Sequence, residues 1–329
     1  MTPSASLDQS IILEAPAAPR RTRFQLLWDP FRENRMAVGG LIIFMLFFLV
    51  ALAGLFLTTG KNPLLDPSAI QLKDKLRPPF YRPDANNPAS GRGPIMGIYL
   101  CGTDDLGRDV FARMLQGAWV SLTVGFVAVG ISVIIGIFMG GIAGYFGHRK
   151  ILPGLSIDAL IMRLVDIMLC FPSFFLILTV VAILPASIYN IMVVIGLTSW
   201  MGTTRFVRAE FLSLREQDFV AAARALGIGN FRIIFRHMMP NAMAPVLVSA
   251  TIGIASAILT EAGLSFLGFG VPPPHATWGN ILSDGKRFIF DAPWLTFIPG
   301  ITILIIVLAF NLFGEGLRDA LNPKLRRGN

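Results

Sequence analysis

The sequence predicts an all-α, polytopic membrane protein with six transmembrane helices. Hydrophobic residues make up 54% of the 329 residues and charged residues only 15%, whereas soluble domains carry about 25% charged residues. Several uncharged stretches also exceed the roughly 20 residues that a helix needs to cross the hydrocarbon. The three histidines lie far apart and there are two cysteines, so neither a metal cluster nor a disulfide framework is expected.

Residues 1–36 are predicted to be an N-terminal tail and juxtamembrane segment. The first 19 residues are polar and rich in Pro and Ala, and Arg20, Arg21 and Arg23 precede the first apolar run. The uncharged residues 37–57 form the first predicted span, which we interpret as an uncleaved signal anchor. Residues 58–117, rich in Pro, Asp, Asn and Gly, are predicted to be a loop outside the membrane.

Residues 118–314 are predicted to be a core with five further spans. No charged residue occurs between Arg113 and His148, so the span at residues 120–146 is expected to follow a lead-in helix that lies along the interface. Gly136, Gly140 and Gly144 fall four apart on one face of this span, a spacing that lets another helix approach closely.

The remaining spans follow from the same absence of charge. Residues 167–204 are uncharged and fit two spans joined by a turn at residues 185–190. A fifth span fits residues 242–269 and a sixth fits residues 292–314. Residues 315–329 are then a C-terminal tail.

The distribution of charge predicts that both termini are cytoplasmic. Six spans place the termini on one side, and cytoplasmic segments carry an excess of Lys and Arg. With the N-terminus inside, the inner segments hold 18 of the 28 Lys and Arg residues, and the 10 outer ones are largely offset by Asp. The net charge of +8 therefore marks cytoplasmic loops, and no nucleic-acid partner is expected.

Residues 210–240 form the most informative predicted cytoplasmic loop. An Ala-rich helical run ends at Gly227, where a positive φ is expected. A second short helix is predicted from Asn230 to Met238, ending before Pro240. From these residues alone, a knob that docks on a cytoplasmic partner and an amphipathic loop on the bilayer surface are equally open.

The segment from Phe219 to Pro240 resembles the EAA loop of binding-protein-dependent ABC permeases. That pattern is Glu-Ala-Ala, three residues, Gly, nine residues and Ile-x-Leu-Pro. Here Ala221 replaces the glutamate, while the following two alanines, the glycine and the final proline match. The resemblance implies an ATPase-coupling loop made of Phe219, Ala221, Ala222, Ala223, Arg224, Gly227 and Pro240.

Further motifs resemble the C-type permease subfamily of dipeptide, oligopeptide and nickel importers. They include Asp29-Pro30-Phe31 and the runs at residues 102–110, 161–166, 261–268, 309–312 and 316–323. The resemblance implies a type I ABC importer permease fold in the bacterial inner membrane and a translocation path for di- or oligopeptides. It also implies a homologous permease subunit, ABC ATPase subunits and an extracytoplasmic solute-binding protein as partners, besides the lipid bilayer.

ATP chemistry is expected to take place on the partner subunits. The pairs Gly60-Lys61 and Gly285-Lys286 are followed by Asn62 and Arg287, so neither completes the phosphate-binding pattern Gly-x-x-x-x-Gly-Lys-Ser/Thr. We therefore expect the chain to be no enzyme and to bind no cofactor, with ATP and Mg used by the ATPase subunits.

Glu261 and Asn311 are the candidate residues for the translocation path. Glu261 is the one acid deep within a predicted span, where an ionisable group is costly and indicates a functional site by default. A buried residue that fixes helix packing is an equal alternative. Nickel, glutathione and sugars remain open as solutes. A secondary transporter is less favoured, because it would show internal repeats or several intramembrane charges.

Overall fold

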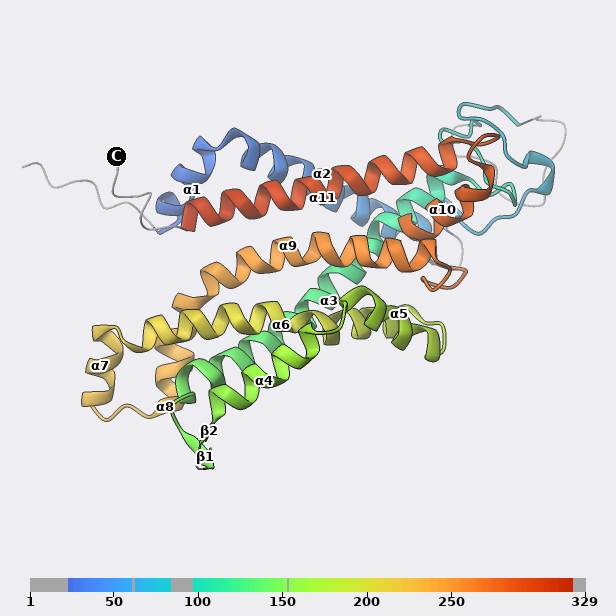
Figure 1. Ribbon diagram of the computed structural model, residues 1–329. Helices are drawn as coiled ribbons and strands as arrows, with labels where there is room; N and C mark the ends of the chain where they lie inside the picture. Colours follow the sequence, from blue (N-terminus) through green and yellow to red (C-terminus); the bar gives the residue numbers. More distant parts are fainter. Residues whose placement is uncertain (1–22, 61–62, 84–96, 153, 322–329) are drawn as a thin grey trace, which may run out of the picture.

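The structure, a computed structural model, describes residues 23–60, 63–83, 97–152 and 154–321. Within these residues the chain is almost entirely α-helical, and the only strands, β1 (Lys150–Leu152) and β2 (Leu155–Ser156), form a short antiparallel hairpin. The long helices run along one another in an elongated bundle (Figure 1). The predicted all-α class is confirmed.

Among the described residues, four helices are long and apolar enough to cross a membrane. The first begins directly after Asn34, whose side chain accepts hydrogen bonds from the backbone N–H groups of Met36 and Ala37 and so caps the helix. The four candidate spans are α2 (Arg35–Thr58), α3 (Val110–Phe146), the helix Asn230–Phe266, which includes α9 (Met239–Phe266), and α11 (Trp294–Leu321).

The predicted lead-in helix and the second span are one element. α3 runs for 37 residues from Val110 to Phe146 and is capped by Asp109. Because no proline interrupts this stretch, the helix continues from the interface into the membrane. The polar segment predicted at residues 58–117 therefore ends at Asp109. At the other end of the chain, α11 continues to Leu321, past the predicted end of the sixth span.

The third span is broken. The turn predicted at residues 185–190 is present, since α5 (Ser173–Ile183) ends and α6 (Ile188–Arg215) begins there. Before it, however, α4 (Ile157–Leu169) and α5 are bent by 79° relative to each other. Pro172 lies in the break, directly before α5, and proline cannot donate the N–H that would continue a helix.

The count of six spans is not confirmed among the described residues. Length and hydropathy support four spans, or five if α4 and α5 together make one. The helix that would complete six is α6. Its second half carries Arg205, Arg208 and Glu210, which lower its hydropathy.

Close packing of α3 against α6 confirms the predicted role of the three glycines. A Cβ atom on Gly140 would lie 2.5 Å from the Thr204 carbonyl oxygen, and one on Gly144 would lie 2.5 Å from the Phe211 Cβ. A side chain at either position would force the helices apart. Small residues therefore allow the contact between the two backbones.

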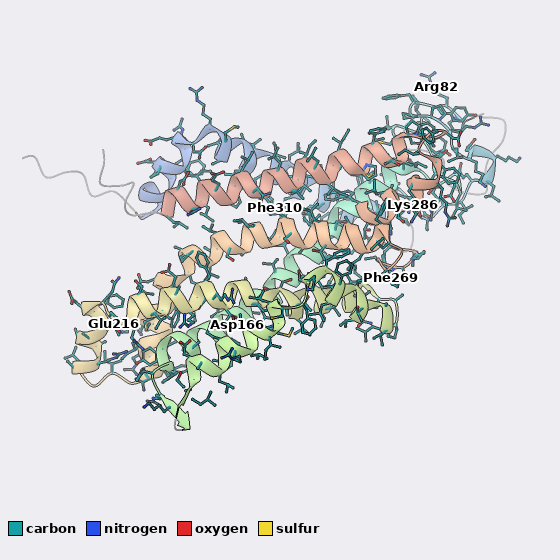
Figure 2. The ribbon with its side chains drawn as sticks, viewed as in Figure 1. Arg82, Asp166, Glu216, Phe269, Lys286 and Phe310 are labelled. Carbon is teal, nitrogen blue, oxygen red and sulfur yellow. The ribbon has the colours of Figure 1, made fainter. Side chains whose placement is uncertain are left out.

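The bundle has two polar ends. One end carries α1 (Arg23–Glu33), α7 (Asp218–Ala225), α8 (Asn230–Arg232) and the hairpin, and α11 also finishes there. The opposite end carries η1 (Leu72–Asp74), α10 (Trp278–Gly285) and η3 (Lys286–Phe288). Figure 2 places Glu216 at the first end and Arg82 and Lys286 at the second. We refer to them as the α7 end and the α10 end.

Candidate functional site

The helix predicted before Gly227 is present as α7. Its C-terminus closes with two hydrogen bonds, from the Gly227 N–H to the Arg224 carbonyl and from the Ile228 N–H to the Ala223 carbonyl. Gly227 has a φ of +73°. This is the Schellman arrangement, in which a glycine beyond the helix takes the left-handed conformation that a Cβ atom disfavours.

Residues 230–238 are helical as predicted, but the predicted end before Pro240 is wrong, because the helix continues. α8 passes through the π-helical turn η2 (Ile233–Met238) into α9, so that one helix runs from Asn230 to Phe266. In this wide turn the Met239 N–H bonds to the Ile234 carbonyl, five residues back. Pro240 lies at the start of α9, where its missing N–H is tolerated.

An apolar cluster anchors the segment of residues 218–240 to the bundle. Val220 and Ala223 of α7 are buried against Phe211 and Leu214 of α6 and Ile233 of η2. Of the predicted coupling residues, only Ala223 belongs to this buried apolar cluster. The others are exposed: Phe219, Ala221, Ala222, Arg224, Gly227 and Pro240.

Tyr145, at the end of α3, contacts both α7 and α8. This residue was not predicted from the sequence. Its hydroxyl donates to the Asn230 side-chain oxygen at 2.7 Å. The Arg224 guanidinium lies 5.3 Å from the centre of its ring, within the range of a cation–π interaction. α3 therefore holds α7 and α8 together. The only signal in the sequence was a tyrosine within an otherwise apolar helix end.

The outer face of the segment is apolar although it projects beyond the bundle. Leu226 is 79% exposed and Phe219 37%. Exposed apolar side chains on a polar end indicate a surface that contacts another protein or the membrane. Leu226 was not among the predicted coupling residues.

A central cavity lies between α3, α6 and α9 and has a volume of about 230 Å³. Hydroxyl residues and glycines share its wall with aliphatic residues, and none of the described residues that line it is charged. On α9 the spacing of this face is visible in the sequence as small residues three and four apart. The polar and glycine residues of the lining are Ser132, Ser199, Gly202, Thr203, Ser249, Gly253, Ser256 and Thr260.

Neither residue predicted for the translocation path lines this cavity. Glu261 is fully buried, and its Oε1 accepts a hydrogen bond from the Ser265 hydroxyl at 2.7 Å. Gly279 of α10 packs directly on Ser265, so Glu261 lies in the contact between α9 and α10. Asn311 is exposed on α11. The roles of Glu261 and Asn311 in translocation stay predictions.

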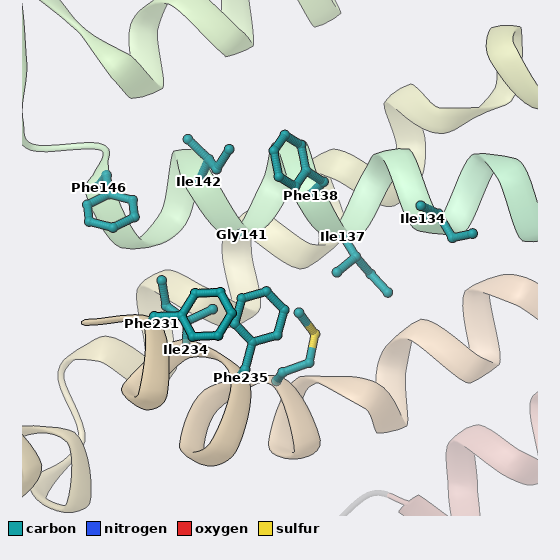
Figure 3. Close-up of a pocket in the computed structure, with 10 residues that line it drawn as sticks. Ile134, Ile137, Phe138, Gly141, Ile142, Phe146, Phe231, Ile234 and Phe235 are labelled. Carbon is teal, nitrogen blue, oxygen red and sulfur yellow. The ribbon is translucent and has the colours of Figure 1, made fainter. Parts of the chain in front are cut away.

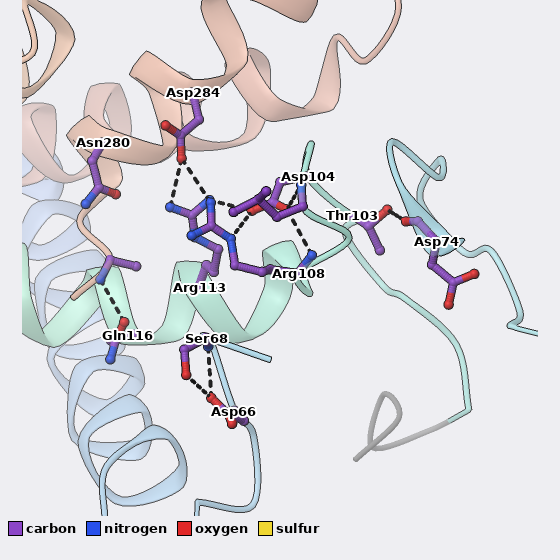
Figure 4. Close-up of polar contacts among 12 residues, drawn as sticks. Asp66, Ser68, Asp74, Thr103, Asp104, Arg108, Arg113, Gln116, Asn280 and Asp284 are labelled. Carbon is purple, nitrogen blue, oxygen red and sulfur yellow. Dashed lines mark hydrogen bonds and ion pairs between the residues drawn. The ribbon is translucent and has the colours of Figure 1, made fainter. Parts of the chain in front are cut away.

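A buried ion-pair network organises the α10 end (Figure 4). Asp104 is fully buried, and its Oδ2 accepts from Arg108 Nε and from Arg113 Nη1, both at 2.7 Å. Its Oδ1 accepts from the backbone N–H groups of Leu106 and Arg108. Arg113 also reaches Asp284 of α10 at 2.9 Å. The network ties the segment before α3 to α10.

Two neighbouring contacts support the same junction. The Gln116 side-chain oxygen accepts from the Ala276 N–H at 2.7 Å, and the Trp278 indole donates to the Met114 carbonyl. The motif at residues 102–110 is visible in the sequence only as a family signature. That motif does not predict the ion pair between Arg113 and Asp284.

Because Asp109 is buried, the free energy of unfolding is expected to depend on pH. Its carboxylate caps α3 by accepting from the Phe111 N–H at 2.9 Å, but burial raises its pKa from 3.8 to about 6. The folded state therefore binds this proton more tightly than the unfolded state, and the resulting stabilisation is present below about pH 4 and is lost as the pH rises through 6. The loss amounts to roughly 3 kcal/mol.

We expect Asp109→Asn, which keeps the cap without the charge, to be more stable than the unmodified protein at pH 8, and to show a clearly smaller gain at pH 4.5. Thermal unfolding in detergent across this pH range measures the difference. A gain of equal size at both pH values would show that the charge of Asp109 is not responsible.

Comparisons with known proteins agree with this architecture. The family model described as "Binding-protein-dependent transport system inner membrane component" matches residues 106–327. A second model, "N-terminal TM domain of oligopeptide transport permease C", matches residues 22–79. The first match includes the α7–α8 segment, the central cavity and, from the ion-pair network, Arg108, Arg113 and Asp284.

Individual relatives match over nearly the whole length. The dipeptide transport system permease protein DppC of Alkalihalophilus pseudofirmus is 40% identical, over 99% of this chain and 97% of the relative. The oligopeptide transport system permease protein OppC of Bacillus subtilis is 36% identical, over 90% of this chain and 88% of the relative.

A chain of the MetNI methionine ABC transporter, solved in inward-facing conformations, shares the fold. It matches with a TM-score of 0.52 at 16% identity, over 65% of this chain and 98% of that chain. Proteins of the matched family are membrane permease subunits without an ATPase or cofactor of their own. The chain belongs to the binding-protein-dependent transport system inner membrane components, as a multi-pass permease subunit of an ABC importer with the type I fold.

Proposed function

We propose that this permease imports dipeptides or oligopeptides. The observation that carries the proposal is the match over 99% of the chain to a dipeptide permease at 40% identity. The central cavity supports it, because its lining is uncharged and rich in hydroxyl groups. Such a wall can exchange hydrogen bonds with a peptide backbone whatever side chains the peptide carries.

We further propose that the α7 end, with both termini, is cytoplasmic and that the α10 end faces outward. Arginines gather at the α7 end, among them Arg149, Arg215, Arg224, Arg232 and Arg236. The excess of cations on the cytoplasmic side of membrane proteins supports this orientation. The predicted domain boundaries are kept, except that α3 begins at Val110 and α11 ends at Leu321.

Residues 218–240 are, in this proposal, the docking element for an ABC ATPase subunit that binds ATP and Mg. The exposed apolar side chains of Phe219 and Leu226 would enter the partner, and the anchor at Tyr145 would transmit its movement to α3. A second, homologous permease would complete the translocation path. An extracytoplasmic solute-binding protein would dock on the α10 end.

Substitution of Gly202 tests the proposed path. A Cβ atom at Gly202 would meet nothing within 4 Å, so Gly202→Leu adds a side chain to the open cavity without a clash inside the chain. We expect peptide uptake by proteoliposomes containing the complete importer to fall at least about tenfold, because the bulk narrows the path, with assembly unchanged.

Gly39→Leu is the matched control. Gly39 also has open space around its Cβ position, but it lies on α2, outside the cavity. If Gly202→Leu took up peptide at the unmodified rate, the cavity would not be part of the translocation path. Failure of the unmodified importer to take up any peptide, alongside uptake of another solute class, would overturn the peptide assignment itself.

A further inference from the structure

An apolar groove lies at the α7 end, between α3 and the start of the helix that contains α9 (Figure 3). Its volume is about 480 Å³. Phe231, Ile234 and Phe235 lie across the groove from α3, which contributes Ile137 and Phe138 to the lining. All ten lining residues are apolar: Ile134, Ile137, Phe138, Gly141, Ile142, Phe146, Phe231, Ile234, Phe235 and Met239.

The groove has the depth of one lipid leaflet. Its wall on α3 extends from Ile134 to Phe146, which at 1.5 Å per residue corresponds to about 18 Å. Half of the hydrocarbon core of a bilayer measures about 15 Å. The groove thus matches the hydrocarbon thickness on the side of the membrane nearest the α7 end.

Arg149 lies beside a groove-lining ring, and two further exposed arginines adjoin groove-lining residues in the sequence. The Arg149 guanidinium lies 4.9 Å from the centre of the Phe146 ring, which lines the groove. Arg232 and Arg236 directly follow Phe231 and Phe235 in the sequence and are exposed. None of the three arginines forms an ion pair with another residue in the described part of the chain.

We propose that this groove binds an anionic phospholipid of the cytoplasmic leaflet. One acyl chain lies against α3 and the 231–239 segment, and the phosphate lies among Arg149, Arg232 and Arg236. Basic residues at the cytoplasmic membrane surface attract anionic headgroups, by about 1 kcal/mol for each Lys or Arg, which is about fivefold in affinity. The orientation of the lipid rests on the proposed topology, in which the α7 end is cytoplasmic.

The position of the lipid connects it to the coupling segment. The groove wall at Ile234 and Phe235 belongs to the π-helical turn that joins α7 and α8 to α9. A bound acyl chain would fill the space between this turn and α3, and an empty groove would leave apolar side chains without packing partners. The lipid would therefore stabilise the geometry of the docking element.

Native mass spectrometry of the complete importer, purified in mild detergent and exchanged with phosphatidylglycerol or phosphatidylcholine, tests the proposal. We expect the importer to retain phosphatidylglycerol in preference to phosphatidylcholine. Ile142→Trp, which fills the groove, should abolish retention. The triple replacement of Arg149, Arg232 and Arg236 by Ala should weaken phosphatidylglycerol binding by about fivefold for each arginine removed.

The matched controls are Ile42→Trp and Arg163→Ala. Ile42 is 63% exposed on α2, near the same end of the bundle, and Arg163 is an exposed arginine of α4; neither borders the groove. Equal retention of both lipids, or retention unchanged by Ile142→Trp, would overturn the lipid site. Loss of the second permease from Ile142→Trp complexes, with no lipid retained by the unmodified importer, would assign the groove to a subunit interface instead. The readout needs neither ATP nor peptide, so its failure would leave the proposed transport function untouched.

Discussion

Asp104→Ala is expected to lower the free energy of unfolding by about 3–5 kcal/mol. Asp104 is fully buried and accepts charged hydrogen bonds from Arg108 and Arg113. Its removal leaves the Arg113 guanidinium, itself only 5% exposed, with Asp284 as its sole described acidic partner. Breaking a buried ion pair from one side costs this much because the remaining charge stays desolvated.

Thermal unfolding in detergent should show the midpoint falling by on the order of 10 °C. Because the network ties α10 to the start of α3, we also expect cleavage of the α10 end by added protease to become faster. Asp105→Ala is the matched control: this neighbouring aspartate forms no ion pair within the described residues. If Asp104→Ala and Asp105→Ala lowered the midpoint equally, the ion-pair network would not be responsible for the stability of this end.

Gly227→Val is expected to reduce solute uptake at least about tenfold while ATP hydrolysis by the partner subunits continues. The φ of +73° at Gly227 costs a β-branched residue on the order of 1–3 kcal/mol. The turn between α7 and α8 would therefore change shape, and the exposed face of α7 would lose its alignment. Uptake and ATPase activity measured on the same proteoliposomes give the ratio of solute moved to ATP consumed.

Gly229→Val provides the comparison, two residues away. Gly229 has a φ of −62° and a ψ of 145°, values that valine adopts readily, and a Cβ atom there meets nothing within 4 Å. Binding of the solute to the solute-binding protein should be unchanged in both variants. Normal uptake by Gly227→Val would contradict the proposed docking role of residues 218–240.

Local patterns allowed part of the candidate site to be predicted. The alanine-rich run followed by Gly227 predicted α7 and its end, because helix propensity and a left-handed terminal residue are properties of neighbouring residues. The continuous helix through Pro240 was not predicted. Proline ends most helices, but a preceding π-helical turn and packing of Ile233 and Met238 into the buried cluster override that preference here.

The sequence predicts the membrane class, the helical composition, the glycine face of α3 and the position of the turn at Gly227. Each depends on composition or spacing within one segment. Packing between distant segments, in contrast, produces the anchor at Tyr145, the central cavity and the pairing of Arg113 with Asp284. Those two residues lie 171 positions apart, and charge satisfaction over such a separation depends on which helix ends the fold brings together.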